Sequence, residues 1–204
     1  MALPEFYTLA PRIVMHDPLA ELLGASDDGL IEYEYADAVR LAGHSCPTVA
    51  GAWLMARAAL RNLYPDAVAE RGGVSVTMSA AENEGTTGVV AQIFTLVTGA
   101  AAANGFHGIG GLHARQGLLA YAGGDAGVVA RFQRHDNGAA VGVALDASQV
   151  SPAPEMRMLL GRALVADATH AERKAFANAW QDRVRCLLLD HAEDAQVIRV
   201  VRYT

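Results

Sequence analysis

The sequence predicts an α+β protein with one domain. Strand and helix patterns alternate only partly along the chain, which favours α+β over a doubly wound sheet. The 204 residues fit one domain, and 52% of them are hydrophobic, enough for a large core. We expect a mixed or antiparallel sheet packed against helices, with a C-terminal helical extension.

Apolar residues at helical spacing define one class of segment, and alternating apolar residues define the other. Helical patterns cover 18–24, 48–64, 89–97, 112–121, 151–164 and 169–189. Strand patterns cover 29–35, 74–78, 128–134, 139–145 and 197–203. Two assignments have alternatives: 89–97 suits a buried helix or a strand, with helix favoured, and 29–35 suits a strand or the lead-in to a helix over 36–41.

Several residues mark where these elements begin and end. Pro47 suits the first position of a helix, where its missing N–H is not needed, and Pro65 ends that helix. Thr169 and Glu172 have the spacing of a capping box. The sequence 135–138 ends in Asn-Gly, the dipeptide typical of a tight turn between two strands, so we predict a hairpin there.

Charge and cysteine content exclude several classes of function. The net charge of −6 argues against a general nucleic-acid binder, which needs a basic surface. Two cysteines are too few for a disulfide framework, so a reduced, cytoplasmic protein is the simpler interpretation. The N-terminus lacks signal-peptide features. The apolar stretch 88–103 is too short and too interrupted by polar residues to span a membrane.

The balance of apolar and charged residues also predicts a partner. Hydrophobic residues make up 52% of the chain and charged residues 19%. Such a composition leaves too little polar surface to cover a lone chain, and two-fold pairing is the commonest remedy. We therefore expect a homodimer.

The segment 43–47, Gly-His-Ser-Cys-Pro, carries the strongest chemical signal. Cys46 directly precedes a predicted helix, where unpaired backbone N–H groups and the helix dipole favour a thiolate. His44 is two residues away, close enough to act as a metal ligand or to carry a proton. A half-buried cysteine and a histidine bonded to backbone carbonyls is the purely structural alternative.

With Ala50 and Gly51 soon after, the segment 43–47 resembles the Gly-His-x-Cys-Pro-Gly signature of the FmdE family of formylmethanofuran dehydrogenase components. The resemblance is strongest over 37–124, and 151–204 would be a helical extension with a closing strand, so that 1–204 forms one FmdE-like domain. It implies an α+β fold, frequent dimers, and a metal such as zinc at the His/Cys motif.

The chain departs from the family pattern at three places. Thr48 follows the proline where a glycine is usual, the segment 82–87 lacks a cysteine, and the C-terminal Cys-x-x-Cys module is missing. The likeness therefore points to the fold and to the His44/Cys46 site, and not to formylmethanofuran chemistry.

A metal at His44 and Cys46 needs at least one more protein ligand, and a catalytic zinc keeps a position open for water or substrate. His113 is the first choice for the third ligand and His107 the second, because both flank a glycine-rich turn that allows close approach. Glu82 and Glu84 are weaker candidates. For each of these residues an ordinary surface position is the alternative. That glycine-rich turn lacks the order of a nucleotide-binding loop.

Three functions are compatible with these residues. The first is a zinc-like site at His44, Cys46 and a third histidine, in an enzyme or in an accessory to a larger oxidoreductase. The second is metal-free thiol or sulfur-transfer chemistry, with Cys46 as nucleophile and His44 as base. The third is a binding module for a flat apolar cofactor such as haem, with His44 or Cys46 as axial ligand. In that case the enclosing residues would be Val49, Ala52, Trp53, Phe106 and Ile109.

Overall fold

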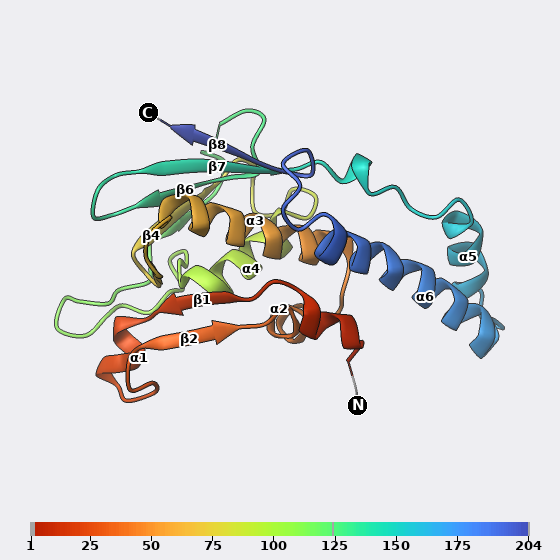
Figure 1. Cartoon of the computed structure of the whole chain (residues 1–204), viewed down its shortest axis with the longest axis horizontal. Coiled ribbons are helices and arrows are strands. Elements are labelled where there is room, and N and C mark those ends of the chain that lie inside the picture. The colour runs from red at the N-terminus through yellow and green to blue at the C-terminus, as the bar shows by residue number, and fades with distance from the viewer. Residues whose placement is uncertain (1–2, 124, 204) are drawn as a thin grey trace.

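The computed structural model describes residues 3–123 and 125–203, and within them two mixed sheets pack against helices (Figure 1). The α+β prediction is confirmed. The expected spans 1–204 and 37–124 each end on residues outside the described ones, Met1, Thr204 and Gly124. The α-helices are α1 (Pro18–Leu22), α2 (Tyr35–Ala42), α3 (Pro47–Leu63), α4 (Thr87–Thr98), α5 (Met156–Ala163) and α6 (His170–Arg185). Shorter helical turns are η1 (Glu5–Leu9), η2 (Ala147–Gln149) and the π-turn η3 (Cys186–Asp190).

The larger sheet has five strands in the order β5-β4-β6-β7-β8. These are β4 (Val74–Met78), β5 (Leu119–Ala120), β6 (Ala130–Arg134), β7 (Ala140–Leu145) and β8 (Ile198–Tyr203). β5 pairs parallel with β4 and the other pairs are antiparallel, so the sheet is mixed, as expected. The β6–β7 hairpin forms where the Asn-Gly pair predicts it, with Gly138 in the left-handed region at φ 73°.

A smaller sheet has the order β2-β1-β3 and lies on the other side of the helices α3 and α4 (Figure 1). It consists of β1 (Ile13–His16), β2 (Leu30–Tyr33) and β3 (Ala69–Glu70). In the segment 29–35, residues 30–33 form β2 and Tyr35 is the first residue of α2. The segment is therefore both a strand and the lead-in to a helix, the two alternatives that the sequence left open.

Helix α3 lies at the centre of the core. Its apolar residues are buried nearly all round, and Val49, Trp53 and Ala56 have no exposed surface. Small side chains allow the close packing: at Gly51 a β-carbon would overlap the side chain of Leu145 on β7. Among the described residues, no helix is both long and apolar enough to cross a membrane.

One predicted element is wrong. The sequence favours a short helix over 112–121, but this segment is a turn that leads into β5. Gly110, Gly111, His113 and Gly117 all have positive φ, which interrupts any right-handed helix. The left-handed positions outweigh the helical spacing of the leucines.

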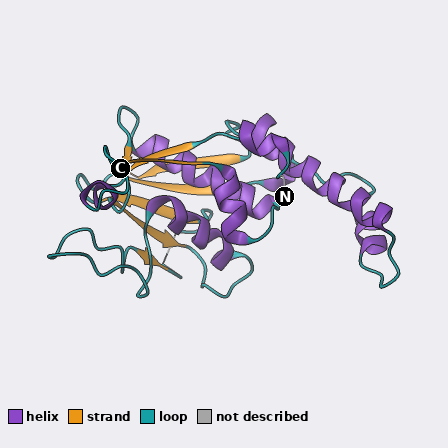
Figure 2. Cartoon of the chain, turned by 90° about the horizontal axis from the view of Figure 1, so that it is seen from below, coloured by secondary structure: helices purple, strands orange, loops and turns teal. Residues whose placement is uncertain are grey.

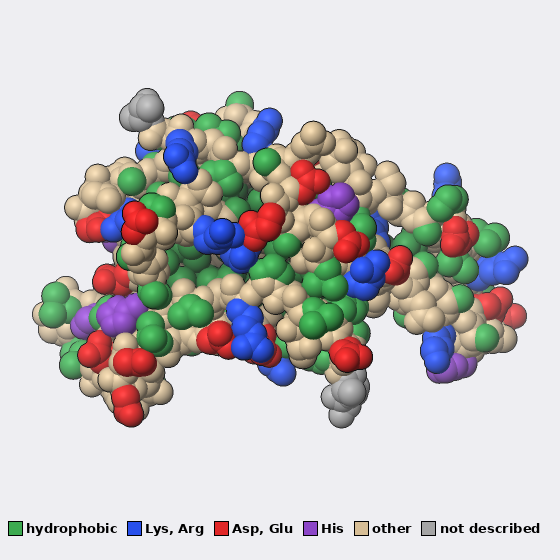
Figure 3. Space-filling model, in the orientation of Figure 1, with side chains coloured by type: hydrophobic (Ala, Val, Ile, Leu, Met, Phe, Trp, Pro, Cys, Tyr) green, Lys and Arg blue, Asp and Glu red, His purple; other side chains and the backbone are tan. Residues whose placement is uncertain are grey.

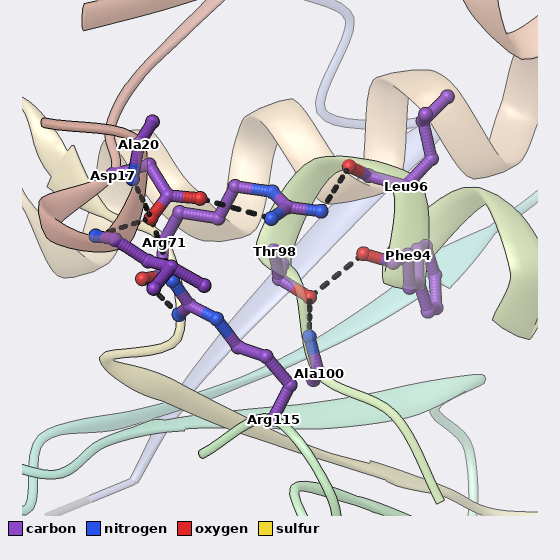
Figure 4. A network of polar contacts seen from close by, with 9 residues as sticks. Asp17, Ala20, Arg71, Phe94, Leu96, Thr98, Ala100 and Arg115 are labelled. Carbon is purple, nitrogen blue, oxygen red and sulfur yellow. Dashed lines mark hydrogen bonds and ion pairs between the residues drawn. The ribbon is translucent and has the colours of Figure 1, made fainter. Parts of the chain in front are cut away.

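A buried ion cluster ties three separate segments together (Figure 4). The Asp17 carboxylate accepts hydrogen bonds from Arg71 Nη1 at 3.0 Å and Arg115 Nη2 at 2.7 Å. Asp17 is 3% exposed and Arg115 6%. Burial opposes ionisation of Asp17, but the Arg71 hydrogen bond and the Arg115 charge outweigh it, and the pKa of Asp17 is lowered. The carboxylate therefore stays charged and holds the loop that contains Arg115 against β1.

Helices α5 and α6 form an arm that extends away from the two sheets (Figures 1 and 2). The predicted capping box is confirmed: Thr169 Oγ1 accepts from Glu172 N at 3.2 Å, and the Glu172 carboxylate accepts from Thr169 N at 2.9 Å. The helical extension of the predicted 151–204 region is therefore present, and β8 returns the chain to the large sheet.

Candidate functional site

The motif 43–47 forms the turn between α2 and α3. A capping box between Glu34 and Asp37 starts α2, and Gly43 ends it in the left-handed conformation at φ 73°. Glycine adopts this conformation without the steric cost that a β-carbon brings. The chain then extends through His44 and Ser45 before α3 begins at Pro47, the predicted first helical residue.

Cys46 is the N-cap of α3. Its backbone is extended, with φ −150° and ψ 167°, and Sγ accepts a hydrogen bond from Val49 N at 3.4 Å. The thiol takes the place that a serine or aspartate oxygen normally fills at a helix start. It is half-buried, and it faces the unpaired N–H groups and the positive end of the dipole of a 17-residue helix. The predicted position of Cys46, directly before a helix, is confirmed.

His44 is exposed and has one ring nitrogen engaged. Nδ1 lies 2.9 Å from the carbonyl oxygen of Ala42, a contact in which Nδ1 carries the hydrogen. That tautomer leaves Nε2 as a base or as a ligand atom. Metal-bound histidines are commonly oriented by such a bond to a backbone carbonyl.

Ser45 fixes the turn from the other side. It is 8% exposed, its Oγ lies 2.9 Å from Tyr35 Oη, and its carbonyl accepts from Trp180 Nε1 at 3.0 Å and Gln181 Nε2 at 3.1 Å. Gln181 in turn accepts from Tyr7 Oη at 3.0 Å. Burial raises the pKa of Tyr35, which keeps its hydroxyl neutral. Sequence reasoning missed this anchor, since no short-range signal links Ser45 to residues 135 positions away.

A pocket of about 350 Å³ lies beside the start of α3. Its walls are mainly apolar, with hydroxyl groups from a few threonines and a serine. The lining residues are Pro47, Thr48, Met55, Ser79, Ala80, Thr86, Thr87, Val90, Val128, Val129, Leu145 and Ala147. Because Pro47 and Thr87 are the first residues of α3 and α4, both helices start at this pocket.

The structure does not bring the predicted third ligands to Cys46 within one chain. α4 starts at the pocket and rises about 18 Å over its 12 residues, at about 1.5 Å per residue. The turn with His107 and His113 follows its far end, and Figure 1 shows this loop, in green, opposite the start of α3. Glu82 and Glu84 are in the loop between β4 and α4, and Glu84 is exposed. In the part of the chain that the structure describes, no three His, Cys, Asp or Glu side chains group as a metal site.

The residues expected to enclose a flat cofactor are also separated. Val49, Ala52 and Trp53 have no exposed surface, and Trp53 Nε1 donates to the Pro11 carbonyl at 2.8 Å. Phe106 and Ile109 are about half exposed in the glycine-rich loop. The first three residues belong to the core, so they do not form a wall together with the other two.

The second cysteine, Cys186, and the hairpin histidine, His135, lie outside the motif 43–47. Cys186 packs against the core at the start of η3, where burial and the nearby Asp190 raise the pKa of its thiol. His135 is exposed in the β6–β7 turn, with Nε2 2.7 Å from Ser75 Oγ. Neither residue takes part in the Cys46 site.

Comparison with protein-family models and with curated proteins finds no match to this chain. Membership of the FmdE family therefore stays a prediction based on the motif 43–47. What the site is able to do follows from its geometry alone.

Proposed function

We propose that the chain acts through Cys46 as a nucleophilic thiol, with His44 as the proton acceptor, on a small and mainly apolar ligand held in the pocket beside α3. The observation that carries this proposal is the Cys46 thiol at the N-cap of α3, where Sγ accepts the Val49 N–H. The thiolate is the reactive form of cysteine, and a helix start stabilises it.

Rigidity of the turn adds to this reactivity. The Ser45 carbonyl has two side-chain donors from α6, and the Ser45 hydroxyl contacts Tyr35. A nucleophile whose neighbours are held in this way loses little freedom when it reacts. The same anchors leave His44 exposed, so its Nε2 is open to solvent and to substrate.

The proposed step is acyl transfer. As Sγ bonds to the carbonyl carbon of the substrate, the thiol proton passes to His44 Nε2. The leaving group departs with its bonding electron pair and takes that proton, which gives an acyl-thiol enzyme and a neutral product. The apolar lining next to Pro47 and Thr48 suits a short aliphatic or aromatic acyl compound, and the threonine hydroxyls suit its carbonyl oxygen.

A thiol-labelling experiment tests the nucleophile. The raised pKa of Cys186 slows its alkylation, whereas Cys46 Sγ lies at the start of α3 and accepts the Val49 N–H, so iodoacetamide should label Cys46 faster, by about tenfold or more at a pH of about 7. Cys46→Ser and Cys186→Ser variants assign each rate by mass spectrometry. Equal rates for the two cysteines from about pH 6 to 9 would refute the proposal.

A second probe tests the pocket apart from the thiol. S-phenyl thioacetate should acetylate Cys46 and release thiophenol. Thr87→Phe, which narrows the pocket, should slow this transfer while iodoacetamide labelling keeps its rate. Unchanged acetyl transfer in Thr87→Phe would show that the pocket does not hold the substrate. His44→Gln should slow the transfer, and His135→Gln at the exposed hairpin is the matched control.

A second candidate function is binding of a zinc-like metal by His44 and Cys46, and one observation favours it. The Nδ1 contact to Ala42 O presents His44 Nε2 in the manner of a metal-ligating imidazole. Imidazole and thiolate are both zinc ligands, but a zinc site needs three or four protein ligands, and the described residues of one chain supply only these two here. The fit to a resident metal is thus incomplete, and no reaction step is assigned to it.

Metal titration decides between the two candidates. Stoichiometric zinc binding that is lost in both His44→Ala and Cys46→Ala, and kept in His135→Ala, supports the metal site. His113→Ala tests the predicted third ligand. Zinc binding that is unchanged in Cys46→Ala removes this candidate.

A further inference from the structure

The pocket beside α3 changes in character from one end to the other. Thr48, two residues after Cys46, and Thr87, the first residue of α4, place hydroxyl groups at the end where both helices start. Met55 lies eight residues after Pro47 on α3, a distance of about 12 Å at about 1.5 Å per residue. The pocket therefore has polar groups near the thiol and an apolar side chain at its far end.

Side chains of the core close this far end. Met55 is 1% exposed, and Val90, one turn into α4, is 6% exposed. Because long side chains on a helix lean toward its N-terminus, Met55 limits the depth of the pocket. Met158 on the arm differs: it is 51% exposed, and Figure 3 shows hydrophobic side chains of the arm, at the right, among charged ones. Met55 thus lines a cavity, whereas Met158 lies on the surface.

A glycine sets the width of the pocket between its two ends. Gly51 lies midway between Pro47 and Met55, at the spacing of four residues that places all three on one face of α3. A β-carbon at Gly51 would lie 2.4 Å from Leu145 Cδ2, so the side chain of Leu145 occupies the space that a larger residue would take. Leu145, on β7, also lines the pocket. The position of its side chain therefore decides how much room is left beside α3.

The size and lining of the pocket indicate what it holds. Its volume of about 350 Å³ is at the lower end of the range of about 300–1,000 Å³ for small-molecule sites. The apolar lining residues are aliphatic, and they offer no ring for the stacked or edge-on contacts that favour an aromatic ligand. An aliphatic chain, in contrast, gains free energy for each methylene group that it buries against such walls.

We propose that the pocket binds an unbranched aliphatic acyl chain, with its carbonyl end at Cys46 and its methyl end at Met55, and that Met55 and Leu145 set the longest chain that fits. The orientation of the chain rests on the proposed acyl transfer at Cys46. The length limit rests on the walls of the pocket alone, so the two are tested separately.

A series of S-phenyl thioesters from acetyl to decanoyl measures the limit through transfer to Cys46. The rate in the parent should rise with chain length and then fall once the chain reaches Met55. Leu145→Ala and Met55→Ala enlarge the pocket, so each should raise the ratio of decanoyl to butanoyl transfer by about tenfold or more, the effect of one methylene group in an apolar pocket. Gly51→Ala pushes Leu145 into the pocket and should change this ratio in the opposite direction.

A binding measurement separates the length limit from the thiol chemistry. Cys46→Ser lacks the thiol, and free carboxylic acids do not acylate it, so calorimetric titration of this variant with butanoate, hexanoate, octanoate and decanoate reports on the pocket alone. When Leu145→Ala is added to Cys46→Ser, the acid that binds most tightly should be a longer one. When Gly51→Ala is added instead, it should be a shorter one.

Leu118→Ala and Gly161→Ala are the matched controls. Leu118 is partly buried against the core but does not line the pocket, and a β-carbon at Gly161 meets no atom within 4 Å. Both variants should keep the chain-length profile of the parent, and circular dichroism checks that each variant is folded. Leu145 is less buried than Met55, so Leu145→Ala carries the test if Met55→Ala does not fold.

The outcomes distinguish the two proposals. Binding profiles that shift as expected, without any acylation of Cys46, support the length limit and count against the thiol chemistry. Thioesters that acylate Cys46 with the same chain-length profile in the parent, Leu145→Ala and Gly51→Ala leave the thiol chemistry standing and overturn the length limit. The length limit is also overturned if Cys46→Ser binds none of the acids, or if Leu118→Ala shifts the profile as much as Leu145→Ala does.

Discussion

Asp17→Asn should strongly destabilise the protein, although it only replaces one carboxylate oxygen of the side chain by an amide NH2 group. Asp17 is 3% exposed, and its carboxylate accepts from two guanidinium groups and from Leu19 N at 2.9 Å. Asparagine keeps an acceptor for the backbone but leaves the buried Arg115 charge without an anion. Removing one member of a buried ion pair typically costs about 3–5 kcal/mol. For a chain of this length that lowers the melting temperature by about 6–20 °C.

Thermal and urea unfolding measure the effect. Asp28→Asn is the matched control, because Asp28 accepts similar bonds from Leu30 N and Ser26 Oγ but is exposed. Its free energy of unfolding should change by no more than about 0.5 kcal/mol. If Asp17→Asn also stays within about 1 kcal/mol of the parent, the ion cluster of Figure 4 does not stabilise the fold as argued.

The pH dependence of unfolding gives an independent check on the same group. The pKa of Asp17 in the folded protein is lowered from its ordinary value of 3.8, so the folded state binds the proton less readily than the unfolded chain. The stabilisation from Asp17 is therefore fully present above pH 3.8 and is lost as pH falls through the lower, folded pKa. The difference in stability between parent and Asp17→Asn should shrink on acidification. A difference that stays constant from about pH 7 to 2 contradicts the assignment.

Two further substitutions test local features of the fold. Gly72→Ala should lower the free energy of unfolding by more than about 2 kcal/mol, because Gly72 has φ +85° and a β-carbon there would overlap the Arg115 guanidinium. Gly24→Ala, at φ +70° but in open space, is the control and should lower it by about 1–2 kcal/mol. Equal losses for the two variants would rule out the overlap. Thr169→Ala should lower the free energy of unfolding by about 1 kcal/mol, because it removes the side-chain cap of α6, whereas Thr169→Ser should stay close to the parent. Equal melting temperatures for the parent and both variants would contradict the capping role.

Elements with short-range signals were predictable from the sequence. The start of α3 at Pro47, the Asn-Gly turn at 137–138 and the capping of α6 at Thr169 each depend on a few neighbouring residues. These residues set backbone conformation directly, by fixing φ, by allowing a positive φ or by pairing a free N–H. The structure confirms each of them.

Elements that depend on distant partners were not predictable in the same way. β1 is four residues long and pairs with the two-residue β3, which follows more than fifty residues later. Nothing in 13–16 by itself distinguishes a strand from an extended loop. The helix prediction for 112–121 was wrong for a related reason. The apolar residues have helical spacing, but glycines and the burial of Arg115 against Asp17 determine the conformation of the loop.

The same difference between local signals and distant partners applies to the candidate site. His44 and Cys46 share one turn, so their proximity and the helix behind them follow from local sequence. Whether His107 or His113 reaches that turn depends on the direction in which α4 runs, and spacing along the chain does not reveal it. Because α3 and α4 start at the same pocket, the C-terminal end of α4 lies far from Cys46, and the loop with His107 and His113 begins there.

The C-terminal extension has a closer relation to the site than its position in the sequence indicates. Sequence patterns predict it as an addition to a domain whose motif lies at 43–47. In the structure, however, Trp180 and Gln181 provide both side-chain donors to the Ser45 carbonyl. A buried carbonyl without donors is unfavourable, so a chain without α6 would have to expose or rearrange this turn. The geometry of the Cys46 thiol therefore depends on α6, because a shift of α6 would move the turn through these two hydrogen bonds.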